Sequence, residues 1–396
     1  METTMANATT KLPGIARHHD HIALVLQGGG ALGAYQAGVY EELATTSYQP
    51  DWIAGVSIGA INAALIAGNP PERRIERLSE FWHLVSSGMG LSGEASSVGP
   101  WLKAVSELPQ PRTAFNQFSA LWSALLGIPG FYRPRIPPAF LQADGTAGAL
   151  SIYDTAPLRA TLEELIDFDL INSKKVRLSM GAVNVRTGNS EYFDNFDRVI
   201  GPEHVMASGA LPPAFPPVMI DGEAYWDGGI VSNTPLQHVL DARARQSVLV
   251  LQVDLFNARG EMPLNVAGVQ QRQKDILYSS RTRYNSNMVA EVANTRKAIR
   301  DLLTRLPPHL KDDDSVKSLI ESMRDAPVDV VHLIYRQVSY ELESKDYEFS
   351  RASVLEHWQA GQRDMRDTIT HPEWLKSSGL DDGVTQYDLT RHSRPL

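Results

Sequence analysis

The chain has 396 residues, of which 43% are hydrophobic, 21% charged and 8% aromatic, as is usual for a globular protein. This length predicts two to three ordinary domains, or one large α/β domain with an appendage. Lys and Arg number 37 against 46 Asp and Glu, a formal net charge of −9 that argues against a nucleic-acid-binding protein. The chain has no cysteine, which excludes disulfides, a thiol nucleophile and thiolate metal sites.

Residues 1–20 are polar and lack the apolar core of a secretory signal, so we predict a flexible N-terminal segment there. Residues 52–68 carry no charge, but the run is short for a membrane span and is interrupted by Gly, Ser and Asn. A buried strand, turn and helix explain this run better. We therefore expect the protein in the cytoplasm, where it could also bind peripherally to a membrane.

The first part of the chain alternates strands and helices. Short apolar runs predict strands over 22–27 and 52–56, and each is followed by a predicted helix, over 33–43 and 58–67. A third helix should begin after Pro70-Pro71. This order predicts parallel strands covered by helices on both faces, which is a three-layer α/β/α sheet.

Residues 86–151 are richer in Gly, Ser and Pro, and they contain an apolar block from Phe118 to Tyr132. Within this block, Leu121, Trp122, Leu125 and Leu126 would share one broad helical face. Two interpretations stay open: a helix packed on the main core, which is the commoner arrangement, or a lid or lipid-facing insertion over the active site.

Strands are predicted again at 176–185 and 247–255, with hairpins at 187–189 and at Asp221-Gly222 between them. A catalytic domain is therefore expected over 21–255. The remaining residues, 256–396, are predicted to form an extension that is mostly helical, with a long helix over 266–306, one strand over 328–335 and a helix over 350–369.

Three glycines, Gly28, Gly29 and Gly30, follow the first predicted strand, and Gly33 begins the next helix. Such a cluster lets the backbone aim several N–H groups at one anion near a helix N-terminus. The anion could be a dinucleotide pyrophosphate or the oxyanion of acyl transfer, and a purely structural turn is the third alternative. A dinucleotide site needs an acidic residue at the end of the second strand, whereas Asp51 begins it.

The segment Gly55-Val56-Ser57-Ile58-Gly59 matches G-x-S-x-G between a predicted strand and a predicted helix, the context of a nucleophile elbow. Gly55 and Gly59 would allow two backbones to approach the turn while the Ser57 hydroxyl projects from it. The N-terminus of the following helix would favour developing negative charge. The alternative is a structural turn.

A serine nucleophile needs a base. None of the 11 histidines follows a strand in a suitable loop, and His204, His238 and His332 are best explained as structural residues. Asp227 ends a predicted strand and precedes Gly228 and Gly229. Burial in a tight loop would raise the pKa of its carboxyl group toward a useful base, although an Asp that caps the loop fits the same pattern.

Together, the glycine loop, the G-x-S-x-G elbow and the distant Asp-Gly-Gly resemble the patatin-like phospholipases, and residues 27–38 look like the bacterial version. The resemblance covers about residues 20–255. It implies that Ser57 is the nucleophile, that Asp227 is its base in a Ser–Asp dyad, and that Gly28, Gly29 and Gly30 supply the oxyanion hole. Many members have Lys or Arg where this chain has Leu32. The tail beyond about Val266, which includes the segment 345–351, resembles the C-terminal extension of a bacterial subgroup.

The resemblance implies a serine acyl hydrolase that cleaves lipid carboxylic esters, of the phospholipase A or lysophospholipase type, through an acyl-enzyme. It implies no metal and no organic cofactor. The expected partners are a lipid ester substrate and a membrane surface contacted by the apolar block 118–132, and a homo-oligomer is left open. The alternatives are a catalytically silent lipid-binding or scaffold protein of the same fold, and a nucleotide-binding module.

Overall fold

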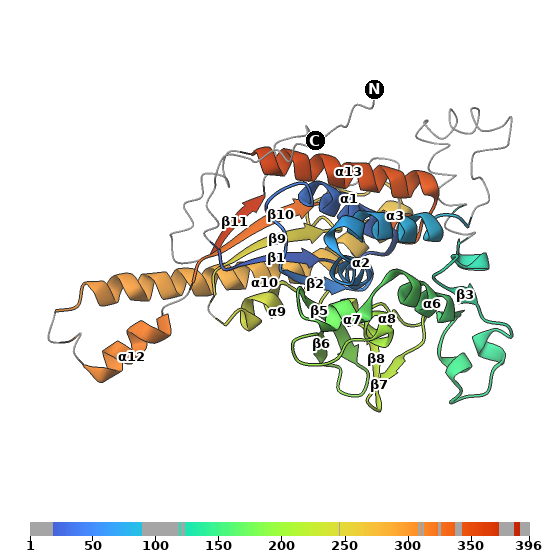
Figure 1. Cartoon of the computed structure of the whole chain (residues 1–396), viewed down its shortest axis with the longest axis horizontal. Coiled ribbons are helices and arrows are strands. Elements are labelled where there is room, and N and C mark those ends of the chain that lie inside the picture. Colours follow the sequence, from blue (N-terminus) through green and yellow to red (C-terminus); the bar gives the residue numbers. More distant parts are fainter. Residues whose placement is uncertain are drawn as a thin grey trace, which may run out of the picture.

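The computed structural model describes residues 19–88, 119, 123–244, 246–307, 310, 313–323, 326–336, 343–371 and 384–388 (Figure 1). The predicted flexible segment 1–20 lies outside these residues except for its last two. Of the region 86–151, for which an insertion was one interpretation, the structure describes residues 86–88, 119 and 123–151.

A nine-stranded sheet forms the centre of the described structure (Figure 1). Along it the strands follow the order β11 (Val384–Asp388), β10 (Val328–Ile334), β9 (Val248–Asp254), β1 (His21–Leu26), β2 (Trp52–Val56), β5 (Arg177–Asn184), β8 (Glu223–Asp227) and β7 (Val218–Ile220), with β6 (Ser190–Asp194) also paired to β5. The six strands from β11 to β5 are parallel. The remaining pairs, β5–β6, β5–β8 and β7–β8, are antiparallel.

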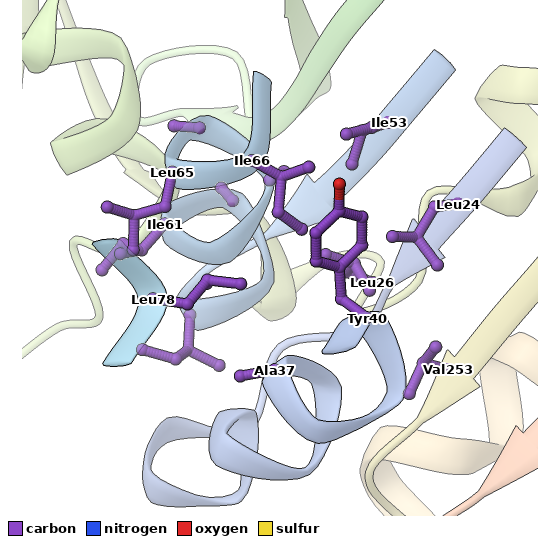
Figure 2. Close-up of a cluster of buried hydrophobic side chains, with 14 of the residues drawn as sticks. Leu24, Leu26, Ala37, Tyr40, Ile53, Ile61, Leu65, Ile66, Leu78 and Val253 are labelled. Atoms are coloured by element: carbon purple, nitrogen blue, oxygen red, sulfur yellow. The ribbon is translucent and has the colours of Figure 1, made fainter. Parts of the chain in front are cut away.

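Helices cover both faces of this sheet (Figure 1). One face carries α1 (Gly33–Leu43), α2 (Ile58–Ala67), α3 (Arg74–Val85) and α13 (Arg351–Thr370), and the other carries α9 (Leu236–Ala242) and α10 (Val266–Thr304). Successive side chains of β1 point to opposite faces of the sheet. Leu24 and Leu26 pack toward α1 and α2 (Figure 2), whereas Ala23 and Val25 belong to the hydrophobic cluster on the other face. The predicted three-layer α/β/α sheet is confirmed.

Smaller elements surround the sheet. They are the helices α6 (Ala156–Leu165), α7 (Phe168–Asn172), α8 (Pro202–Ser208) and α12 (Asp314–Met323), the strand pair β3 (Arg133–Pro134) and β4 (Tyr153–Asp154), and the 3₁₀ turns η1 (Gly30–Leu32), η2 (Pro71–Arg73), η3 (Ala139–Leu141), η4 (Ala147–Leu150), η5 (Gly228–Ile230) and η6 (Glu343–Asp346). Among the helices described, none has both the length and the apolar character needed to cross a bilayer.

The C-terminal region differs from its prediction in one respect. The described residues of 256–396 contain two strands where one was expected, and both extend the main sheet because β10 pairs in parallel with β9 and β11 with β10. Helix α13 also packs closely on α1, where Gly38 faces Gly361. A Cβ atom at either glycine would collide with a main-chain oxygen of the other helix. The region therefore shares the sheet and the core of the preceding residues.

The apolar block 118–132 is divided between surface and core. Leu121 and Trp122 lie outside the described residues. Leu125 and Leu126 are 62% and 57% exposed, whereas Ile128 and Tyr132 are buried in the main core. The end of the block is thus core, as one interpretation expected, and its described middle faces solvent.

Candidate active site

Ser57 occupies a sharp turn between β2 and α2. Its backbone has φ 57° and ψ −125°, a strained conformation for a residue with a side chain. The turn requires two glycines, because a Cβ at Gly55 would collide with the backbone of Gly59, and one at Gly59 with the Leu26 carbonyl. Ser57 is also half-exposed, while its neighbours on both sides are buried. These features fit the predicted nucleophile elbow.

Ser208 supports this turn through hydrogen bonds. The Ser57 N–H donates to both the carbonyl oxygen and the Oγ of Ser208, each at 3.1 Å. The buried Ser208 hydroxyl in turn donates to the Gly181 carbonyl at 2.6 Å. This supporting residue was missed in the sequence, where a single small polar residue at the end of a short helix gives no signal.

Asp227 ends β8 and is 2% exposed. Its Oδ1 accepts the Gly229 N–H at 2.7 Å, and the carboxyl group lies close enough to the Ser57 hydroxyl for that hydroxyl to lower its pKa. Burial raises the pKa of Asp227 to about 6, and the hydrogen bonds from Ser57 and Gly229 offset part of that rise. A carboxyl group with such a pKa, in contact with a serine hydroxyl, can take its proton near neutral pH.

The glycine loop lies beside Ser57. A Cβ built on Gly28 would approach the Ser57 Cβ to 3.0 Å. The Gly28 N–H donates to the Asn233 carbonyl at 3.1 Å and is therefore occupied. The Gly29 and Gly30 N–H groups have no acceptor among the described residues. Of the three predicted oxyanion donors, Gly29 and Gly30 have free N–H groups in this conformation.

A family model described as patatin-like phospholipase matches residues 24–240, more than half of the chain. The chain belongs to the patatin-like phospholipase family. A second model, described as patatin phospholipase, matches residues 276–379, which confirms the resemblance of the C-terminal region.

Several members of the family and one solved structure are similar to the chain. Patatin-like phospholipase domain-containing protein 7 of Rattus norvegicus is 25% identical over 253 residues, which are 62% of this chain and 14% of the relative. The cGAMP-activated phospholipase of Pseudomonas aeruginosa is 27% identical over 239 residues, which are 57% of this chain and 56% of that relative. VipD from Legionella pneumophila has 16% identity and a TM-score of 0.35, with 88% of this chain and 66% of the other covered.

No histidine is hydrogen-bonded to Ser57 in the described part of this patatin-like chain. The ring of His204 accepts the Gly201 N–H, His238 stacks on Tyr192, and His332 lies 3.3 Å from Asp254. All three therefore have structural contacts, in keeping with their interpretation from the sequence.

Two buried amide side chains tie the patatin-like site together. The Asn233 side chain donates to the Gly28 carbonyl at 2.9 Å, so Asn233 binds both backbone groups of that glycine. The Gln27 Oε1 accepts the N–H groups of Leu255 and Phe256 at 2.6 and 3.0 Å. Gln27 also donates to Thr234 Oγ1 at 3.1 Å. Neither role was predicted from the sequence, although Gln27 adjoins the three glycines and Asn233 follows the Asp-Gly-Gly motif.

The acidic residue considered for a dinucleotide lies away from the glycine loop. Asp51 precedes β2 and accepts the Ile22 N–H at the opposite end of the parallel strands. Its carboxylate also contacts His21 at 3.2 Å. The ribose contact of a dinucleotide site therefore has no counterpart at Asp51. Nor do the described residues contain a cluster of three or more His, Asp or Glu side chains suited to a metal ion.

Proposed function

We propose that this chain is a serine acyl hydrolase that cleaves carboxylic esters of lipids. The proposal rests above all on one observation: the strained elbow serine Ser57 lies beside the buried Asp227 carboxyl group, close enough for the serine hydroxyl to lower the pKa that burial raises to about 6. The lipid class of the substrate follows from the family name and from the named phospholipases among the relatives.

The reaction would begin with transfer of the Ser57 hydroxyl proton to Asp227 while Oγ attacks the ester carbonyl carbon. The carbonyl oxygen becomes an oxyanion, which the N–H groups of Gly29 and Gly30 stabilise. The C–O bond then breaks, and the alcohol or lysolipid leaves with the proton held by Asp227. Water attacks the acyl-enzyme, Asp227 takes one water proton, and that proton returns to Ser57 as the fatty acid departs.

Helix α2 adds to the stabilisation of this oxyanion. It starts directly after Ser57, is ten residues long and contains no acidic side chain in its first turn, so its positive end is not neutralised locally. Gly228, which follows Asp227, has a separate role. A Cβ at Gly228 would come near the Gly181 carbonyl, so only glycine lets the loop pass under β5.

Contact with a lipid surface is the second part of the proposal. Five exposed apolar side chains lie between residues 125 and 141: Leu125, Leu126, Ile136, Phe140 and Leu141. Strand β3 of this segment pairs with β4, and the N–H groups of Ile152 and Tyr153, at the start of β4, donate to the carbonyl groups of the loop 213–214. That loop follows Ala210, whose carbonyl accepts the Asp227 N–H. Apolar insertion next to the site would deliver the ester without a positively charged surface.

Covalent labelling tests the proposal. A fluorophosphonate should modify Ser57, as identified by mass spectrometry, and Ser57→Ala should abolish both labelling and turnover of a medium-chain ester. Ser208→Ala serves as a control, because that hydroxyl supports the elbow but is not the proposed nucleophile. Labelling of another serine, or full labelling of Ser57→Ala, would contradict the proposal. Lipid binding without turnover would favour the silent scaffold, and saturable ATP or NAD binding the nucleotide-binding module.

A further inference from the structure

The C-terminal region contacts the glycine loop directly. Gly30 has φ +55°, and a Cβ at this position would collide with the carbonyl oxygen of Asp346 in η6. The main chains of the two segments are therefore in contact at the residue whose N–H is a proposed oxyanion donor. Nothing in the glycine loop itself can make side-chain contacts, so its conformation depends on what packs around it.

Two ion pairs attach η6 to α10. Lys345 Nζ lies 2.9 Å from Asp275 Oδ1, and Lys274 Nζ lies 2.9 Å from Asp346 Oδ1, so adjacent residues of one segment pair with adjacent residues of the other. The Lys345–Asp275 pair is buried, and Asp275 also accepts a hydrogen bond from Gln271. Desolvation makes a buried ion pair a poor source of stability compared with apolar packing, so these residues call for a role other than stability.

Helix α10 also contacts the residue that precedes the loop. The Gln27 side chain donates to the Tyr278 carbonyl at 3.3 Å, directly before the glycines. The Tyr278 ring lies 4.9 Å from the Phe256 ring, and an edge carbon of Phe256 would lie 3.2 Å from a Cβ on Gly29. The Lys345 ammonium lies 5.5 Å from the centre of the same Phe256 ring. Helix α10 thus contacts the residue before the glycine loop, and both α10 and η6 contact Phe256, which packs against Gly29.

We propose that the ion pairs Lys345–Asp275 and Lys274–Asp346 form a bracket that holds the Gly29 and Gly30 N–H groups in position for the oxyanion. Lys345 is accordingly a positioning residue, supplied by the C-terminal region and not by the segment that carries Ser57 and Asp227. This inference rests on the proposed function. Its physical basis is that oxyanion donors act only when they are fixed before the reaction, and that misplacement by about 1 Å can cost about 100-fold in rate.

The bracket is tested with Lys345→Met in the full chain. We expect kcat on a soluble ester to fall roughly 10- to 100-fold with little change in KM, because the lost contact acts in the transition state. Amide exchange should accelerate in the peptide covering residues 27–36. Arg366→Gln is the matched control: it removes an ion pair from α13 to Glu42 of α1, away from the loop, and should change neither kcat nor that exchange.

Two further variants separate positioning from folding. Lys345→Met combined with Asp275→Leu leaves no lone buried charge, so the melting temperature should recover while kcat stays low. Recovery of kcat together with the melting temperature would overturn the bracket. Lys274→Gln tests the second, partly exposed pair, and it should lower kcat even if Lys345→Met fails to fold.

The exchange measurement distinguishes this inference from the proposed function. If the wild-type chain neither hydrolyses esters nor is labelled at Ser57, the proposed function fails, whereas faster exchange of residues 27–36 in Lys345→Met would still support the bracket. Unchanged exchange in Lys345→Met and Lys274→Gln would overturn the bracket even in an active hydrolase.

Discussion

Gly28 and Asn233 are joined by two hydrogen bonds. The Gly28 N–H donates to the Asn233 carbonyl at 3.1 Å, and the Asn233 side chain donates to the Gly28 carbonyl at 2.9 Å. The two residues are far apart in the sequence, one before η1 and the other after the Asp227 loop. This pairing sets the distance between the proposed oxyanion donors and the proposed base.

Asn233→Asp should therefore impair the reaction strongly. A carboxylate cannot donate to the Gly28 carbonyl, and its charge would oppose the oxyanion, so we expect a loss of about 100-fold or more in kcat. Asn195→Asp is a suitable control, because Asn195 is fully buried and bonds to three backbone groups remote from Ser57. It should lower the melting temperature without changing the activity of the folded fraction. Equal kcat losses in the two variants would count against a specific role for Asn233.

The pH dependence of the reaction should report Asp227. A base with a pKa of about 6 is ionised only above that value, so kcat/KM should rise with pH and level off above about 7. A steady-state profile on a soluble ester, measured between pH 4.5 and 8.5, checks this. An acid limb near pH 4 would mean that the carboxyl group is not desolvated in the working enzyme.

Asp227→Asn should make the protein more stable at neutral pH. The folded pKa of about 6 lies above the ordinary value of 3.8, so between these pH values the folded state holds a proton that the unfolded state has lost. The free energy of unfolding therefore falls as the pH rises from about 4 to 6. Above that range, the ionised Asp227 lowers it by about 3 kcal/mol. Asn carries no charge, and its melting temperature should exceed the wild-type value at pH 8 but not at pH 4. A wild-type chain as stable as Asp227→Asn at pH 8 would contradict this.

Ser57→Gly should melt at a higher temperature than Ser57→Ala. Both substitutions remove the nucleophile, but only glycine adopts φ 57° and ψ −125° without steric strain. Relief of a strain of about 1–3 kcal/mol, less the larger entropy of glycine in the unfolded chain, leaves a gain of about 1 kcal/mol. Calorimetry on the two inactive variants measures the difference, and identical melting temperatures would show that the elbow is not strained.

Replacing Leu125 and Leu126 with Ser should reduce hydrolysis of vesicle lipids far more than hydrolysis of a short soluble ester. Both side chains are exposed, so the melting temperature should stay unchanged. Ile128→Ser is the matched control, because Ile128 is buried and its loss should lower stability and affect both substrates. Because the net charge is −9, the vesicle activity should depend weakly on salt. If the double variant were as active on vesicles as the wild-type chain, this surface would be excluded as the lipid contact.

Local patterns were sufficient for the main elements of the fold. The helices over 33–43 and 58–67 and the strand over 52–56 were predicted with the bounds that the structure has, because glycines or prolines lie near most of their ends and the strand is a short apolar run. The hairpin turn at Asp221-Gly222 was also predicted, because Asp-Gly is a typical type I′ sequence. The structure confirms it, since both residues have positive φ. The strand β11 was missed, because a short polar run becomes a strand here only by pairing with β10.

The sequence by itself determined which residues could react: a serine between glycines in a strand–helix turn, an aspartate before two glycines, and a glycine loop after a strand. It could not show that Gly28 is bonded to Asn233, that Ser208 supports the elbow, or that Lys345 and Asp346 adjoin the glycine loop. These contacts join residues distant in the chain, and no local periodicity encodes them. The tertiary structure alone decided them. The parallel strands β1 and β2 bring the glycine loop and Ser57 to one edge of the sheet, antiparallel pairing of β8 with β5 brings Asp227 there, and burial raises the pKa of Asp227.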